Sequence, residues 1–201
     1  MDHYMVSKTT GQPDWANIPA LAIAQPYLQT PAGIDAFAQI CYEEDGLLLH
    51  LWTHVPQIRS VETGPLGMPC EDSCLEFFFQ PVPGDSRYLN LEFNSNGCMY
   101  LGIGTGIADL VRLVPDDGQS IFCPHIQMID GGWEIFYRIP YSFVRRLFPG
   151  AAIVPGQTIR ANCFACSDLT VPHYYLSWSL IEGQPFTYHR SECFGEMTFE
   201  K

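Results

Sequence analysis

The chain has 201 residues, of which 47% are hydrophobic and only 16% are charged. This composition supports a sizeable core and excludes global disorder, and the length fits a single domain, residues 1–201, better than two domains. The net charge of -12 argues against nucleic acid and anionic membrane as partners, and no run approaches the roughly 20 apolar residues of a membrane span.

Residues 1–30 are expected to form an N-terminal arm, because prolines interrupt them and they show little periodicity. Trp15 and Ile18 are expected to begin an edge strand or a covering segment. The first residues lack a basic region followed by an apolar region, so no secretory signal is visible. We therefore expect a cytoplasmic protein; the alternative is a secreted protein whose signal has been removed.

Alternation of hydrophobic and other residues predicts strands through most of the chain. In the stretch 47–55, for example, Leu49 and Leu51 share one face while His50 and Trp52 share the other. The strands are expected at 35–43, 47–55, within 70–80, within 87–97, and at 98–103, 109–113, 121–129, 133–139, 159–166, 174–180 and 194–199.

One short helix is predicted at 141–148, capped by Ser142 and ended by Pro149-Gly150. Many short strands with one helix are typical of an all-β fold, an antiparallel β-sandwich of the jelly-roll or immunoglobulin-like kind.

The two strands within 70–80 and 87–97 are the most informative. Leu75, Phe77 and Phe79 give the first strand a buried face, and a turn rich in Pro, Gly, Asp and Ser precedes the second. The other face carries Glu76, Glu92 and Asn94. Such a face is either exposed to water or binds a polar ligand.

The eight cysteines do not by themselves indicate a special chemistry, because a chain this long and apolar needs no disulfide staples. Cys163-x-x-Cys166 is a single pair without the second Cys or His pair that a zinc site normally requires.

Four blocks in order resemble the carbohydrate-binding module family 9-like domains: 71–76 (EDSCLE), 88–94 (YLNLEFN), 173–178 (HYYLSW), and His189-Arg190 before Phe194-Gly195. The resemblance runs from about Asp35 to the C-terminus. It implies a β-sandwich that binds sugars without cleaving them, in which two tryptophans clamp a terminal sugar ring. It also implies structural calcium ions.

The resemblance implies a carbohydrate ligand held by Glu76, Glu92, Asn94, Trp178, His189 and Arg190. Trp178 stands where the second clamp tryptophan belongs, and Glu92 falls where some members carry a basic residue. The first clamp tryptophan would fall at Cys70, whose side chain cannot replace an indole face.

Simpler roles for these residues stay open. Trp178 shares its face with Leu176 and Leu180, as a core residue would. Glu76 could pair with Arg87 or Arg160 to satisfy a half-buried carboxylate. The acidic turns 43–45 and 116–117 offer oxygen ligands for calcium but lack the spacing of a dedicated loop.

Two other classes of function also remain. Glu76 and Glu92 could lie about 5 to 10 Å apart, as glycosidase carboxylates do. A catalytic pair would have one raised pKa, whereas a binding site would leave both groups ionised. The third class is an interaction-only sandwich with a decayed sugar pocket, which the missing aromatic at Cys70 suits.

Overall fold

The computed structural model describes residues 2–27 and 30–201. In this part of the chain, one mixed sheet contains fourteen strands. The strands are β1 His3–Lys8, β2 Leu21–Ala22, β3 Gln25–Pro26, β4 Asp35–Tyr42, β5 Gly46–His54, β6 Cys74–Gln80, β7 Tyr88–Asn94, β8 Met99–Gly104, β9 Val111–Leu113, β10 His125–Ile129, β11 Gly132–Pro140, β12 Thr158–Ser167, β13 Tyr174–Ser177 and β14 Gly195–Phe199. The α-helices are α1 Gly118–Phe122 and α2 Tyr141–Leu147.

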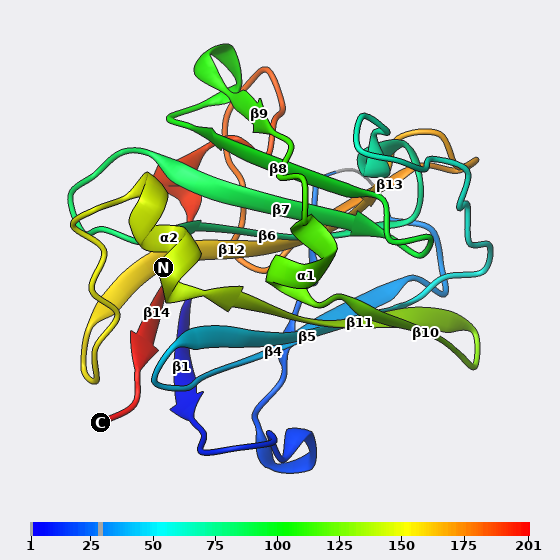
Figure 1. Cartoon of the computed structure of the whole chain (residues 1–201). Helices are drawn as coiled ribbons and strands as arrows, with labels where there is room; N and C mark the ends of the chain where they lie inside the picture. The colour runs from blue at the N-terminus through cyan, green and yellow to red at the C-terminus, as the bar shows by residue number, and fades with distance from the viewer. Residues whose placement is uncertain (1, 28–29) are drawn as a thin grey trace.

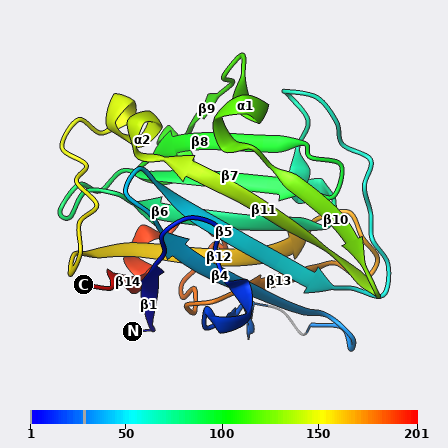
Figure 2. The same ribbon diagram turned by 60° about the horizontal axis from the view of Figure 1, so that its bottom comes forward.

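The sheet curls so that its two halves face each other as layers (Figure 1). One layer follows the order β10-β11-β5-β4, and the other follows β12-β6-β7-β8-β9. Strands β1 and β14 connect the two layers along the sheet. A second view shows the layer of β4, β5 and β11 crossing over the other layer (Figure 2).

The main core lies between the layers, where the alternating hydrophobic residues of both meet. Leu75, Phe77 and Phe79 on β6 are at most 1% exposed, as the alternation predicts. The rings of Phe93 on β7 and Tyr137 on β11 lie 5.0 Å apart and join the two layers. The opposite face of β6 and β7 carries a second, smaller buried cluster, which includes Cys74, Phe78 and Tyr88.

The N-terminal arm contains three strands that the sequence did not predict, β1, β2 and β3. β1 lies between β14 and β4 and pairs in parallel with both, for example Tyr4 with Met197 and Ser7 with Cys41. The prediction of a purely antiparallel sheet is therefore wrong at β1. Trp15–Asn17 form a short 3-10 helix and no edge strand.

The helices differ from the prediction in two ways. The strand expected at 121–129 begins only at His125, because residues 118–122 form α1. The predicted helix at 141–148 is confirmed as α2, but its N-cap residue is Pro140 and no side chain caps it, so Ser142 is not the cap. Neither helix in the described part of the chain could cross a membrane.

Candidate functional site

Strand register places the two predicted carboxylates side by side on the outer face of one layer. Glu76 on β6 pairs with Glu92 on β7. The same row continues to Phe164 on β12 and to Tyr100 on β8. Because side chains directly opposite on antiparallel strands lie about 5 Å apart, both carboxyl groups meet at one place.

A cavity of about 350 Å³ opens above this row. This volume lies within the range of small-ligand pockets. We call it the Glu pocket; its lining residues are Met68, Cys70, Glu76, Glu92, Tyr100, Ile107, Leu110, Cys166, Asp168, Tyr175, Phe186, Thr187, Tyr188 and His189. The pocket thus brings together Glu76, Glu92 and His189 from the predicted set, with Cys70 beside them.

Burial dominates the electrostatics of the carboxyl pair. Glu76 is 2% exposed and Glu92 is 6% exposed. Burial, followed by the charge of Asp168, raises the pKa of Glu76 to about 7. Burial and the neighbouring Glu76 raise the pKa of Glu92 well above its usual range.

We expected one raised pKa in a catalytic pair and two ionised groups in a binding site; in the structure the pKa values of both carboxyl groups are raised. Since burial is the first cause of both shifts, a raised pKa does not by itself distinguish catalysis from binding. The suggested ion pairs of Glu76 are also absent among the described residues: Arg87 pairs with Asp85, and Arg160 donates to backbone carbonyl oxygens. Instead the Cys166 thiol donates to Glu76 Oε1 over 3.0 Å.

A glycine on β8 makes room for the group that holds Glu92. The Asn90 amide donates to Glu92 Oε1 over 2.7 Å. A Cβ atom at Gly102, the register partner of Asn90, would come within 2.1 Å of Asn90 Oδ1. Only glycine fits opposite Asn90, so this pair fixes the orientation of the Glu92 carboxyl group.

His189 reaches the pocket from the segment before β14. The Tyr88 hydroxyl lies 2.7 Å from His189 Nδ1, and the Phe78 ring centroid lies 5.2 Å from the imidazole. Burial lowers the pKa of His189 to about 4. The imidazole is therefore neutral at neutral pH and can exchange one hydrogen bond with a polar ligand.

Aromatic rings form the walls of the Glu pocket. Tyr175 on β13 lies 5.4 Å from Phe186 between ring centroids, and Tyr27 stacks on Phe186 at 3.5 Å. On the β8 side, the Arg112 guanidinium lies 4.6 Å from the Tyr100 ring centroid. Sequence reasoning missed these walls; the aromatic character of 174–175 and 186–188 was the only local signal.

Asn94 lies outside the pocket lining and is fully buried. Its amide nitrogen donates to the Glu62 carbonyl oxygen over 2.8 Å and to Asp72 Oδ2 over 2.7 Å. Its Oδ1 accepts from the backbone amides of Asn96 and Cys98 at 3.0 and 2.9 Å. These bonds use both donors and both lone pairs, so Asn94 has no polar group left for a ligand.

Trp178 and Arg190 also lie outside the lining. Trp178 belongs to the main core, 6.5 Å from Tyr4 between ring centroids, and a Cβ atom at Gly195 would come within 2.8 Å of its ring. Arg190 pairs with Glu192 and donates to the Pro185 carbonyl oxygen. Trp178 and Arg190 therefore both contact other residues of the chain, away from the pocket.

The side chains of the acidic turns 43–45 and 116–117 are not arranged to bind calcium. Arg138 forms ion pairs with Glu43 and Asp45 at 3.5 and 3.0 Å, so a cation of the protein already neutralises the first turn. Among the described residues, no three carboxylates converge within 4.8 Å of one another. Calcium prefers several such oxygen ligands.

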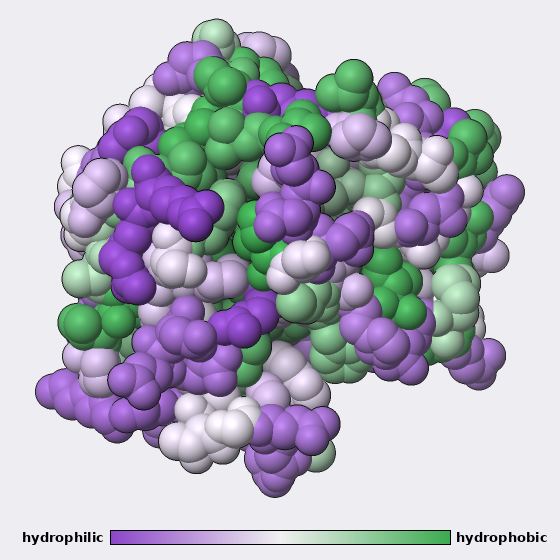
Figure 3. Space-filling model, viewed as in Figure 1, coloured by the Kyte–Doolittle hydropathy of each residue, from purple (hydrophilic) through white to green (hydrophobic). Residues whose placement is uncertain are grey.

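Hydrophobic surface gathers at the top of the molecule over β8 and β9 (Figure 3). Ile107 and Val111 are 60% and 56% exposed there. Ile107 also lines the pocket, so apolar surface continues from the pocket to its rim.

Comparison with solved structures gives relatives over the whole chain. A Bacteroides uniformis ATCC 8492 protein to which carbohydrate binding has been ascribed has a TM-score of 0.84 at 24% identity, over 98% of this chain and 99% of that chain. A carbohydrate-binding module of family 9 from Caldicellulosiruptor kristjanssonii has a TM-score of 0.69 at 13% identity in two structures, with glucose and with cellotriose. Each covers 99% of this chain, and they are covered over 96% and 94% of their own length.

No curated protein sequence matches the chain. The family model of carbohydrate-binding family 9 matches residues 25–199, which is nearly the whole chain and includes every residue that lines the Glu pocket. The resemblance carried by the four sequence blocks is thereby confirmed, and the chain belongs to carbohydrate-binding family 9.

Proposed function

We propose that the chain binds a mono- or oligosaccharide end in the Glu pocket without cleaving it, on a β-sandwich scaffold. The observation that carries this proposal is the pocket itself: aromatic walls stand over a buried carboxyl pair on a family 9 domain.

The pocket suits the chemistry of a pyranose ring, which has an apolar CH face and a rim of hydroxyl groups. Tyr175 or Phe186 takes the apolar face, since aromatic rings offer large rigid area at a low ordering cost. Glu76, Glu92 and His189 then exchange hydrogen bonds with the hydroxyl groups. With raised pKa values the carboxyl pair can carry a proton, so it can donate as well as accept, and the positions of these donors and acceptors fix which hydroxyl pattern binds.

Isothermal titration calorimetry is the suitable test, because none of the four tryptophans lines the pocket to report binding by fluorescence. The family 9 neighbours bind glucose and cellotriose, so the panel begins with glucose, cellobiose and cellotriose and adds xylobiose, maltose and galactose. Each titration is run with and without calcium. Saturable heat with at least one sugar is expected, and silence across the panel would contradict the proposal.

Matched variants locate the binding. Glu76→Gln replaces one carboxyl oxygen by an NH2 group that can only donate, and is expected to lower affinity about tenfold or more. Tyr175→Ala is expected to lower it to a similar degree by removing a wall. Glu134→Gln and Phe136→Ala, on β11 of the other layer, are the controls and should bind as the unchanged protein does.

Chromatography of the sugar after long incubation tests the absence of cleavage. Intact sugar is expected. Shortened oligosaccharide that disappears with Glu76→Gln would instead assign glycosidase activity to the carboxyl pair.

A further inference from the structure

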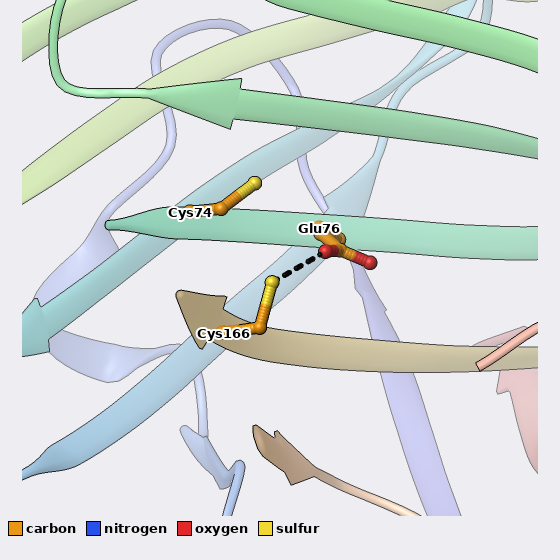
Figure 4. A group of neighbouring side chains, drawn as sticks. All are labelled: Cys74, Glu76 and Cys166. Atoms are coloured by element: carbon orange, nitrogen blue, oxygen red, sulfur yellow. Dashed lines mark hydrogen bonds between the residues drawn. The ribbon is translucent and has the colours of Figure 1, made fainter. Parts of the chain in front are cut away.

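Two cysteines on neighbouring strands lie close to Glu76, and the Cys166 sulfur points at its carboxyl group (Figure 4). Cys74 on β6 and Cys166 on β12 are register partners, and Glu76 follows Cys74 by two residues on the same face. The Cys166 Sγ lies 3.0 Å from Glu76 Oε1, and the ligand atoms of all three residues lie within 4.8 Å of one another.

Burying these three side chains together costs the protein free energy. All three residues are at most 2% exposed. Within the described residues, no basic side chain forms an ion pair with Glu76. Thiol groups are weak donors, so they compensate a buried carboxylate poorly. A cation at this place would satisfy all three side chains at once.

The geometry points to a zinc site formed by Cys74, Glu76 and Cys166. Tetrahedral zinc has bonds of about 2.3 Å to sulfur and about 2.0 to 2.2 Å to carboxylate oxygen, which puts ligand atoms about 3.5 to 3.8 Å apart. The three atoms need only small side-chain adjustments to meet this geometry. This inference goes beyond sugar binding and does not depend on it.

The ligand set selects the metal. Two sulfur ligands favour zinc over calcium, which takes six to eight oxygen ligands. When zinc binds, two S–H bonds break, and two S–Zn bonds and one O–Zn bond to Glu76 form. The two thiol protons, and the carboxyl proton wherever Glu76 carries one, leave to solvent. The product carries two thiolates and one carboxylate on a divalent ion, with no change of oxidation state.

The surroundings provide both rigidity and access. The ligands stand on β6 and β12, neighbouring strands inside the sheet, so the backbone holds their spacing. Phe78, Phe164 and Tyr188 pack around the two cysteines. Cys70, Glu76 and Cys166 also line the Glu pocket, so the ion enters through the pocket. The fourth coordination position of the ion faces the pocket, where a water molecule completes the tetrahedron.

Cobalt substitution tests the site without any sugar. Co²⁺ added to the full chain under reducing conditions is expected to bind one ion per chain, with thiolate charge-transfer absorption and the visible bands of a tetrahedral ion. Zn²⁺ should displace it. Cys74→Ala and Cys166→Ala should each weaken binding at least tenfold and lose a thiolate band, and the double variant should lose both.

Cys163→Ala is the matched control, because Cys163 is equally buried on β12 but belongs to the main core. It should leave Co²⁺ binding unchanged. Absence of the thiolate bands in the unchanged protein, or their survival in the double variant, would overturn the site. X-ray absorption of the zinc-loaded unchanged protein decides the question if the variants do not fold. At least two sulfur neighbours at about 2.3 Å support the site, and a shell of only oxygen and nitrogen overturns it.

Discussion

At the scale of single residues, Asn94 holds the segment before β6 against the turn after β7. Its amide binds Glu62 and Asp72, and its oxygen binds two backbone amides of the turn. Asn94→Ala leaves these buried partners without hydrogen bonds. We expect it to lower the free energy of unfolding by about 2 to 4 kcal/mol, measured by urea denaturation.

The neighbouring Asn96→Ala serves as its control. Asn96 is exposed and its side chain donates one bond to the Ser60 carbonyl oxygen, so a loss below about 1 kcal/mol is expected. If the Asn94→Ala protein has normal stability but no longer binds sugar, Asn94 is a ligand-binding residue after all.

Trp178 tests the clamp role that the family resemblance implied. Because its ring packs in the main core against Tyr4 and Gly195, Trp178→Ala is expected to cost about 3 to 5 kcal/mol of stability. Calorimetry on the folded fraction should show unchanged sugar affinity. Normal stability with abolished binding would be the signature of a clamp instead.

His189 makes stability depend on pH. Its pKa is about 4 in the folded protein and 6.5 ordinarily, so between these values only the unfolded chain takes up the proton. Above pH 6.5 the imidazole is neutral in both states, so it does not lower the free energy of unfolding. As the pH drops to about 4, protonation of the unfolded chain lowers that free energy by about 3 kcal/mol.

Chemical denaturation at several pH values checks this prediction. His189→Gln cannot titrate, so the difference in unfolding free energy between it and the unchanged protein should shift over that window. A difference that stays constant with pH would show that the imidazole is not held neutral.

The sequence predicted the carboxyl pair correctly as neighbours on one sheet face, because period-two alternation fixes the face of Glu76 and of Glu92. It could not predict that Cys74 meets Cys166, since the register between β6 and β12 joins residues far apart in the chain. The role of Trp178 shows the same limit. Its local pattern with Leu176 indicated core, while the family blocks indicated a ligand platform.

At the scale of elements, strong alternation predicted β5, β6, β7 and β11 close to their observed bounds. α1 was mistaken for a strand because Ile121 and Phe122 continue into the hydrophobic pattern of β10. Five residues contain too few helical turns to show a helical period. β1 was missed because a six-residue strand is stabilised by its partners β4 and β14, which its local sequence does not reveal.

Strand β1 offers a clean test of its place in the sheet. Val6 is fully buried, whereas Met5 is 46% exposed. Val6→Asp would place a carboxylate in the core and is expected to lower the free energy of unfolding by about 4 kcal/mol or more. Met5→Asp should change it by less than about 1 kcal/mol. Equal small effects would mean that β1 is peripheral, as the predicted arm would be.

At the scale of the whole molecule, the two layers share one core and one continuous sheet. We therefore expect them to unfold together. Native-state hydrogen exchange should give the same opening free energy for the slowest amides of β5 and of β7. A lower value for one layer, by more than about 1 kcal/mol, would show that the layers unfold separately.

The parallel pairing of β1 with β14 has a consequence for biosynthesis. Strand β1 leaves the ribosome long before its partner β14 at 195–199. The pairing that joins the two layers therefore cannot form before residues 195–199 have emerged, whatever the speed of local folding. Long-range pairing of this kind slows folding and leaves strand edges open in the meantime. In a nascent chain β1 can pair with β4 early, but its other edge stays open until β14 has emerged.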